Sequence, residues 1–96
     1  MQKAFTTEDR NVLTDFGDYF KGLPGYTVEE TDQSVAVTHE DRFLGLKWQQ
    51  SGELKATFRV GGELAGTTAR IKRIWITETI GGRRLSVSLG YTTYSI

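Results

Sequence analysis

The sequence predicts an α+β fold, with one N-terminal helix packed on one face of a five- to six-stranded antiparallel meander sheet. Apolar residues recur at three- and four-residue spacing only near the N-terminus, and they alternate with a period of two from about residue 26 to residue 96. Short polar or glycine-containing segments separate the alternating stretches, and each is short enough for a hairpin. The 96 residues therefore predict a single α+β domain, residues 1–96.

The predicted helix covers about residues 7–22. Thr6 or Thr7 can cap its start, and acidic residues follow in the first turn, where the helix dipole favours negative charge. Pro24 cannot continue a helix, so the segment GLPG ends it. The apolar stripe that we expect to cover the sheet comprises Val12, Leu13, Phe16, Tyr19, Phe20 and Leu23.

Two hairpins can be assigned a register from the alternation alone. A turn at residues 40–41 places two valines and two leucines on one face, because cross-strand partners share a face of the sheet. A turn at Gly81-Gly82 does the same for the last hairpin, with the isoleucines beside Trp75 turned inward and the indole turned outward. The predicted pairs are Val37 with Leu44, Val35 with Leu46, Glu78 with Leu85, Ile76 with Val87, Ile74 with Leu89, and Lys72 with Tyr91.

The stretch RVGGELAGTTARI, residues 59–71, has two glycines at the spacing of a phosphate-binding P-loop. Thr67 stands at the position of the P-loop lysine, and the residues that follow are rich in β-branched side chains and lack the apolar spacing of a helix. The stretch therefore predicts a hairpin with Gly61-Gly62 at its tip rather than a nucleotide site.

The alternation of inward and outward residues in this hairpin does not continue correctly into the last hairpin. Pairing across its tip places Phe58 opposite Ala65, and strict alternation would then turn Trp75 inward. One extra residue is required between the two hairpins. Gly66 is its natural place, since glycine permits a β-bulge, so we expect a bulge or a strand break near the segment AGTT.

The residues contain no pattern that predicts catalysis, a metal or a cofactor. The single histidine, His39, lies beside Glu40 and Asp41 and could carry a proton, but catalysis needs a second convergent group. A solvated turn residue is the simpler interpretation. The serines lie in no nucleophile-elbow context, and one histidine with scattered acids does not match the spacing of a metal site. We expect a protein that is not an enzyme.

The composition also predicts where the protein works. The chain contains no cysteine, and its apolar runs are far too short to cross a membrane. Polar residues follow directly after the first five, so the apolar core of a signal peptide is not recognised there. We expect a cytoplasmic protein without a membrane partner.

Charge is distributed unevenly along a chain whose net charge is zero. Residues 1–41 contain nine acidic and three basic residues, whereas residues 42–96 contain nine basic and three acidic residues. This asymmetry predicts a surface for a polyanion or an acidic protein, unless folding interleaves the two halves and the charges cancel locally.

Basic and aromatic residues are predicted to gather on the face of the sheet away from the helix. Tryptophan and arginine are favoured anchors of protein interfaces, and the same mixture suits the bases and phosphates of single-stranded nucleic acid. An ordinary solvated face is the third interpretation. An exposed tryptophan among polar residues argues against it, because such a large aromatic side chain is more stable when a loop or a partner covers it. The predicted partner-binding residues are Trp75, Arg73, Arg84, Arg59, Lys47, Lys55 and Phe43.

The leading hypothesis is a small non-catalytic protein that docks on another protein, as an inhibitor, immunity factor or accessory subunit. The alternative is a nucleic-acid-binding protein that uses the basic face, and a second alternative is a small-ligand pocket between helix and sheet, lined by Tyr19, Trp48 and Tyr91. The last strand, LSVSLGYTTYSI, would be a sheet edge at which a second copy could pair to form a homodimer.

Overall fold

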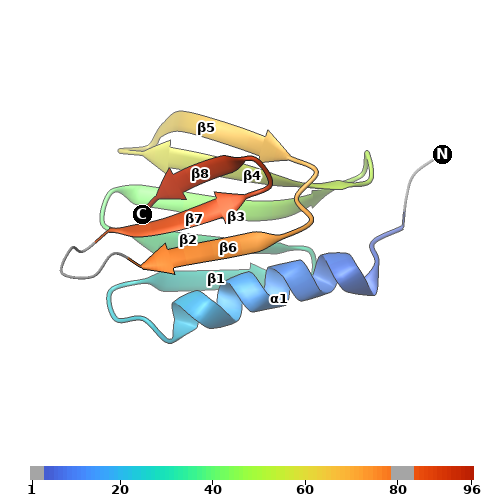
Figure 1. Cartoon of the computed structure of the whole chain (residues 1–96), viewed down its shortest axis with the longest axis horizontal. Coiled ribbons are helices and arrows are strands. Elements are labelled where there is room, and N and C mark those ends of the chain that lie inside the picture. Colours follow the sequence, from blue (N-terminus) through green and yellow to red (C-terminus); the bar gives the residue numbers. More distant parts are fainter. Residues whose placement is uncertain (1–3, 79–83) are drawn as a thin grey trace.

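The computed structural model describes residues 4–78 and 84–96, and it confirms the α+β class with one helix and antiparallel sheets (Figure 1). The strands number eight in the described residues and form two sheets, rather than the predicted five to six in one. Sheet A has the order β1-β2-β3-β4-β5, and sheet B has the order β6-β7-β8. The elements are α1 (Thr7–Lys21), β1 (Thr27–Thr31), β2 (Ser34–His39), β3 (Arg42–Gln49), β4 (Glu53–Val60), β5 (Glu63–Ala69), β6 (Ile74–Glu78), β7 (Leu85–Leu89) and β8 (Thr92–Ser95).

Helix α1 begins with a capping box. The Asp9 backbone N–H donates to Thr6 Oγ1 at 3.1 Å, and the Thr6 backbone N–H donates to Asp9 Oδ2 at 3.0 Å. This identifies Thr6 as the cap. The helix ends at Lys21 with Gly22 as its C-cap, close to the predicted end. Leu13, Phe16 and Phe20 of the predicted stripe are buried.

The molecule has two layers. Sheet A forms one layer, and α1 and sheet B lie side by side in the other, with α1 next to β6 (Figure 1). Helix α1 packs on β1 and β2, and sheet B covers the remaining part of the same face of sheet A. The core between the layers comprises Leu13, Phe16, Phe20, Val35, Val37, Leu44, Leu46, Trp48, Leu54, Ala56, Phe58, Ile71, Leu85, Val87, Leu89, Tyr94 and Ile96.

The chain passes from sheet A to sheet B through residues 70–73. Arg70 adopts a left-handed conformation with φ of 60°, which turns the chain out of sheet A directly after β5. Ile71 then inserts its side chain into the core. The predicted pairing of Lys72 with Tyr91 is therefore wrong, because β6 begins only at Ile74 and Tyr91 lies in the turn between β7 and β8.

Both registers that the alternation predicts are otherwise confirmed. Strands β2 and β3 pair Val37 with Leu44 and Val35 with Leu46. Strands β6 and β7 pair Ile74 with Leu89, Ile76 with Val87, and Glu78 with Leu85. The predicted turn at Gly81-Gly82 lies outside the described residues.

The predicted bulge is also present. The register of β4 against β5 shifts between Phe58 and Arg59, whose partners are Gly66 and Leu64, so Ala65 is the extra residue. The predicted pairing of Phe58 with Ala65 is wrong by this one residue. Gly66 faces the core, where a Cβ atom would come within 3.1 Å of Tyr94 Cε1, so the glycine provides space for this ring.

Candidate functional site

The seven predicted partner-binding residues do not share one face, and this corrects the single basic surface inferred from the sequence. Sheets A and B pack against each other through their apolar faces, so their outward faces lie on opposite sides of the molecule. The outward face of sheet A carries Phe43, Lys47, Lys55 and Arg59. The outward face of sheet B carries Trp75, with Arg73 directly before β6, whereas Arg84, directly before β7, belongs to neither group.

The outward face of sheet A places cations around one aromatic ring. Cross-strand pairing sets Phe43 opposite Arg59, and Lys47 opposite Lys55. A Cβ atom on Gly45 would meet Phe43 Cζ at 2.9 Å, so the Phe43 ring lies over this glycine. These residues line a shallow depression of about 370 Å³ whose lining contains no carboxylate.

The two lysines on this face are poorly matched to each other. Like charges directly opposite in an antiparallel pair destabilise the sheet. Lys47 and Lys55 are both exposed, which reduces this cost, and a bound anion would remove it. The arrangement can therefore hold phosphate or carboxylate groups beside an aromatic platform.

The outward face of sheet B is different in chemistry. Trp75 is 58% exposed and lies opposite Ser88, because Ile74 and Ile76 on either side turn toward the core. The Arg73 guanidinium lies 5.5 Å from the centroid of the Trp75 ring, within the range of a cation–π contact. The other described residues that point outward from the three strands are uncharged, and they are Thr77, Ser86, Ser88, Thr93 and Ser95.

Arg84 lies away from both groups. It lines a separate depression of about 370 Å³ with His39, Glu40 and Arg42. Arg42 Nη1 donates to the Ser95 carbonyl at 2.7 Å. The mixture of one acid and two arginines gives this depression no charge pattern of its own.

His39 is not the solvated turn residue suggested by the sequence. It is the last residue of β2, it is half-buried, and its ring stacks on Tyr26 with 4.3 Å between the centroids and 14° between the planes. Tyr26 in turn donates a hydrogen bond to the Ile96 carbonyl at 3.3 Å. His39 therefore has a packing role in this structure.

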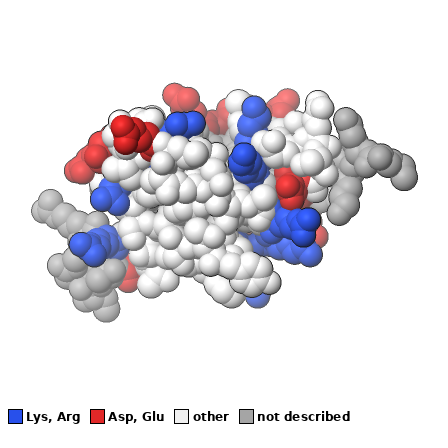
Figure 2. All heavy atoms as spheres, turned by 90° about the horizontal axis from the view of Figure 1, so that it is seen from above, with Lys and Arg blue, Asp and Glu red and all other residues white. Residues whose placement is uncertain are grey.

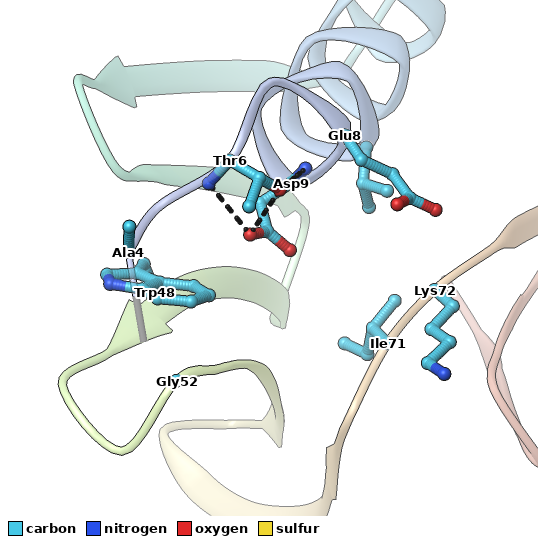
Figure 3. A pocket seen from close by; sticks show the side chains of 9 residues that line it. Ala4, Thr6, Glu8, Asp9, Trp48, Gly52, Ile71 and Lys72 are labelled. Atoms are coloured by element: carbon cyan, nitrogen blue, oxygen red, sulfur yellow. Dashed lines mark hydrogen bonds between the residues drawn. The ribbon is translucent and has the colours of Figure 1, made fainter. Parts of the chain in front are cut away.

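A groove of about 450 Å³ lies where the start of α1 meets β3 and the connection 70–73 (Figure 3). Trp48 and Ile71 give it an apolar wall, and Glu8 and Lys72 lie at its rim. The positive end of the helix is already used here, because Asp9 accepts the hydrogen bonds of the cap. Sequence reasoning missed this groove, since its signal, the left-handed Arg70 before Ile71, is a backbone feature.

The ligand pocket predicted between helix and sheet is not assembled. Of its three predicted residues, only Trp48 lines the groove at the start of α1. The Tyr19 hydroxyl donates to Glu78 Oε1, and the side chain of Tyr91 is fully exposed on a turn. The space between the layers contains large buried side chains such as Phe16 and Phe20.

Two further findings limit the chemistry of the described residues, 4–78 and 84–96. No group of three or more His, Asp or Glu side chains in them is placed to hold a metal ion. Within the same ranges, no helix has both the length and the apolar character needed to span a membrane. Comparisons with protein-family models, curated proteins and solved structures find no match.

Proposed function

We propose that this chain is a small, non-catalytic cytoplasmic protein that acts by docking on another protein, as an inhibitor, immunity factor or accessory subunit. The docking surface is the outward face of sheet B, and Trp75 is its anchor. The observation that supports this proposal is a tryptophan with more than half of its side chain exposed, on a regular strand and surrounded by hydroxyl groups.

Burial of Trp75 by a partner would contribute a substantial binding free energy. A tryptophan side chain can bury up to about 250 Å². Covering the exposed 58% of Trp75 would contribute up to about 3.6 kcal/mol at about 25 cal/mol per Å², and about 2.7 kcal/mol of this is already enough for roughly 100-fold in affinity. The Arg73 guanidinium lies beside the indole, and tryptophan and arginine are among the residue types most enriched at interface hot spots.

The surroundings of Trp75 fit a protein partner as well. Serine and threonine offer adaptable hydrogen bonds beside a rigid aromatic anchor, which is the composition of many protein-recognising surfaces. Because the outward residues of the three strands are uncharged, the affinity should depend little on salt.

The test is capture of partners by immobilised wild-type protein from a nuclease-treated lysate, at about 0.1 M and about 0.5 M salt. Trp75→Ala should lose the partner, with an affinity roughly 100-fold weaker once the complex is reconstituted. Leu64→Ala is the matched control, because Leu64 is 59% exposed but lies on sheet A, and it should bind within about twofold of wild type. A partner that binds the Trp75→Ala variant as tightly as wild type would contradict the proposal.

One observation favours a second candidate, which is single-stranded nucleic acid on the outward face of sheet A. The cations Lys47, Lys55 and Arg59 surround the Phe43 ring in a depression without acids. Bases stack on aromatic rings, and phosphates would relieve the repulsion between the two lysines.

Fluorescence anisotropy with a labelled oligothymidine tests this candidate. Wild type should bind at low salt, and the slope of log affinity against log salt should decrease by about one for each cation removed in Lys47→Gln and Lys55→Gln. Arg73→Gln is the control on the opposite face and should leave the slope unchanged. Absence of binding at low salt would exclude nucleic acid without affecting the proposal for Trp75.

A further inference from the structure

We propose that two copies of this chain pair through the free edge of β5 to form an antiparallel dimer, in which the two five-stranded sheets become one continuous sheet. Strand β5 is the last strand of sheet A and pairs only with β4. In the described parts of the chain, no other backbone hydrogen bond reaches residues 63–69. One row of N–H and C=O groups of this strand is therefore available to another strand.

Strand β5 differs from the other three edges of the two sheets. At β1, Glu29 and Glu30 add charge, and Lys21 of α1 forms an ion pair with Glu30 at 2.9 Å. At β6, helix α1 lies alongside, and Tyr19 bonds to Glu78 (Figure 1).

At β8, the edge is tied to sheet A. The Thr92 hydroxyl forms a hydrogen bond of 2.7 Å with the Thr68 hydroxyl of β5, and Tyr94 packs against Gly66. Proteins protect edge strands with charges, prolines or covering elements, and β5 has none of these from Leu64 to Ala69. Figure 2, which looks onto the side formed by β5 and β8, shows a broad central area without charged residues.

The bulge at Ala65 limits the pairing but does not prevent it. Bulges often protect an edge by twisting it away from neighbours. Here the bulge lies near the start of β5, and Gly66, Thr67, Thr68 and Ala69 remain in regular register with β4. This run has small side chains that allow a second strand to approach closely.

The charges at the two ends of β5 favour a second copy of this chain as the partner that pairs with its free edge. The strand begins with Glu63. Arg70 follows its last residue, and its Nε lies 3.3 Å from Glu53 Oε2 of the same chain, but 87% of the Arg70 side chain is exposed, which leaves room for a second carboxylate. Antiparallel pairing brings the start of one strand beside the end of the other, so Glu63 of each copy approaches Arg70 of its partner. A two-fold axis produces this contact twice, as an isologous interface requires.

Sedimentation velocity from about 1 µM to about 1 mM protein tests the dimer. Wild type should show a concentration-dependent dimer. Thr67→Lys, which places a lysine from each copy close to the axis, should weaken dimerisation at least tenfold. Thr27→Lys is the matched control on β1, the opposite edge of sheet A, and should leave the dissociation constant unchanged. Circular dichroism verifies that both variants are folded.

A charge exchange tests the orientation of the pair. Glu63→Arg and Arg70→Glu should each weaken the dimer, and the double variant should restore it, because the partner copy carries the complementary exchange. A chain that is monomeric at every concentration would overturn the proposal and leave this edge to a strand of a different protein. A dimer that survives Thr67→Lys but is lost in Trp75→Ala would also overturn it, since the contact would then lie on sheet B.

Discussion

The outward faces of the two sheets are built over one core by the same alternation of residues, yet they differ in chemistry. Sheet A presents three cations around Phe43, whereas the strands of sheet B present hydroxyl groups around Trp75. An attraction that depends on the cations weakens with salt, and one that depends on the tryptophan does not. Salt dependence therefore distinguishes which face a partner uses, even before the partner is identified.

The support beneath the two aromatic side chains differs too. The Phe43 ring lies over Gly45 and is half-buried, so part of its area already stabilises the fold. The Trp75 ring is 58% exposed and has Arg73 as its cation–π neighbour. Part of the Phe43 ring therefore stabilises the fold, whereas more than half of Trp75 remains in contact with solvent.

The largest expected effect comes from breaking the contact between the sheets. Phe58 of β4 is buried, and its ring centroid lies 5.0 Å from that of Tyr94 in β8. Phe58→Ala should lower the free energy of unfolding by about 3–5 kcal/mol, because it leaves a cavity that the rigid sheets cannot close. Urea denaturation measures this loss. Arg59→Ala, at the next position but facing outward, should change the stability by less than about 0.5 kcal/mol.

The result of Phe58→Ala also tests whether the two faces depend on each other. A small domain has only about 5–15 kcal/mol of stability, so this variant should lose a large part of it and both outward faces together. A loss below about 1 kcal/mol would mean that the sheets are not held together at this contact.

The second prediction compares the two aromatic residues directly. Phe43→Ala should lower the free energy of unfolding by about 1–2 kcal/mol, since it removes a half-buried ring from the sheet. Trp75→Ala should change it by less than about 0.5 kcal/mol, because most of the ring is in contact with solvent. Thermal and urea unfolding of the two variants provide the measurement. Equal losses of unfolding free energy in the two variants would show that the Trp75 ring stabilises the fold as much as the Phe43 ring does.

The sequence predicted which residues of each strand face the core, because the alternation of inward and outward side chains is a local property of a strand. The inward isoleucines around Trp75 and the extra residue near Gly66 follow from alternation alone, and the structure contains both. The division into two sheets could not be predicted in this way. Alternation indicates which residues of a strand share a face, but it does not show to which sheet the strand belongs.

The missing information lies in contacts between residues distant in sequence. Arg70 turns the chain out of sheet A in a left-handed conformation, although it is not a glycine. Tyr94 then packs over Gly66 and Phe58, which places sheet B on top of sheet A. The same division separates Trp75 from Phe43 and so determines the candidate sites.

A third prediction concerns the buried hydroxyl at this contact. Tyr94 Oη has no hydrogen-bond partner among the described residues, and its burial raises the pKa of Tyr94. The nearest polar group is the Thr68 hydroxyl, which lowers the pKa of Tyr94 in opposition to burial, but it forms its own hydrogen bond with Thr92 and makes none of good geometry with Tyr94. Tyr94→Phe should therefore raise the free energy of unfolding by about 1 kcal/mol, because an unpaired buried hydroxyl is costly. A decrease of similar size would instead show that the hydroxyl is hydrogen-bonded in solution.

The last prediction concerns the boundary between α1 and sheet B. The hydrogen bond from Tyr19 to Glu78, together with partial burial and the charge of that carboxylate, raises the pKa of Tyr19 from 10.0 to about 12. Above the lower of these values the unfolded chain releases the phenol proton while the folded chain retains it. The stabilisation is therefore complete below pH 10.0 and is lost as the pH rises towards about 12.

Glu78→Gln separates this contact from the other tyrosines. Removing the carboxylate charge should return the pKa of Tyr19 towards its ordinary value, while burial still raises the pKa of Tyr94. NMR titration of the tyrosine rings in wild type and variant measures both, and Tyr19→Phe assigns the Tyr19 signal. If Tyr19 titrates at its ordinary pKa in wild type, α1 is not fastened to β6 by this bond. The edge of sheet B at β6, the strand that carries Trp75, would then not be closed by the Tyr19–Glu78 contact with α1.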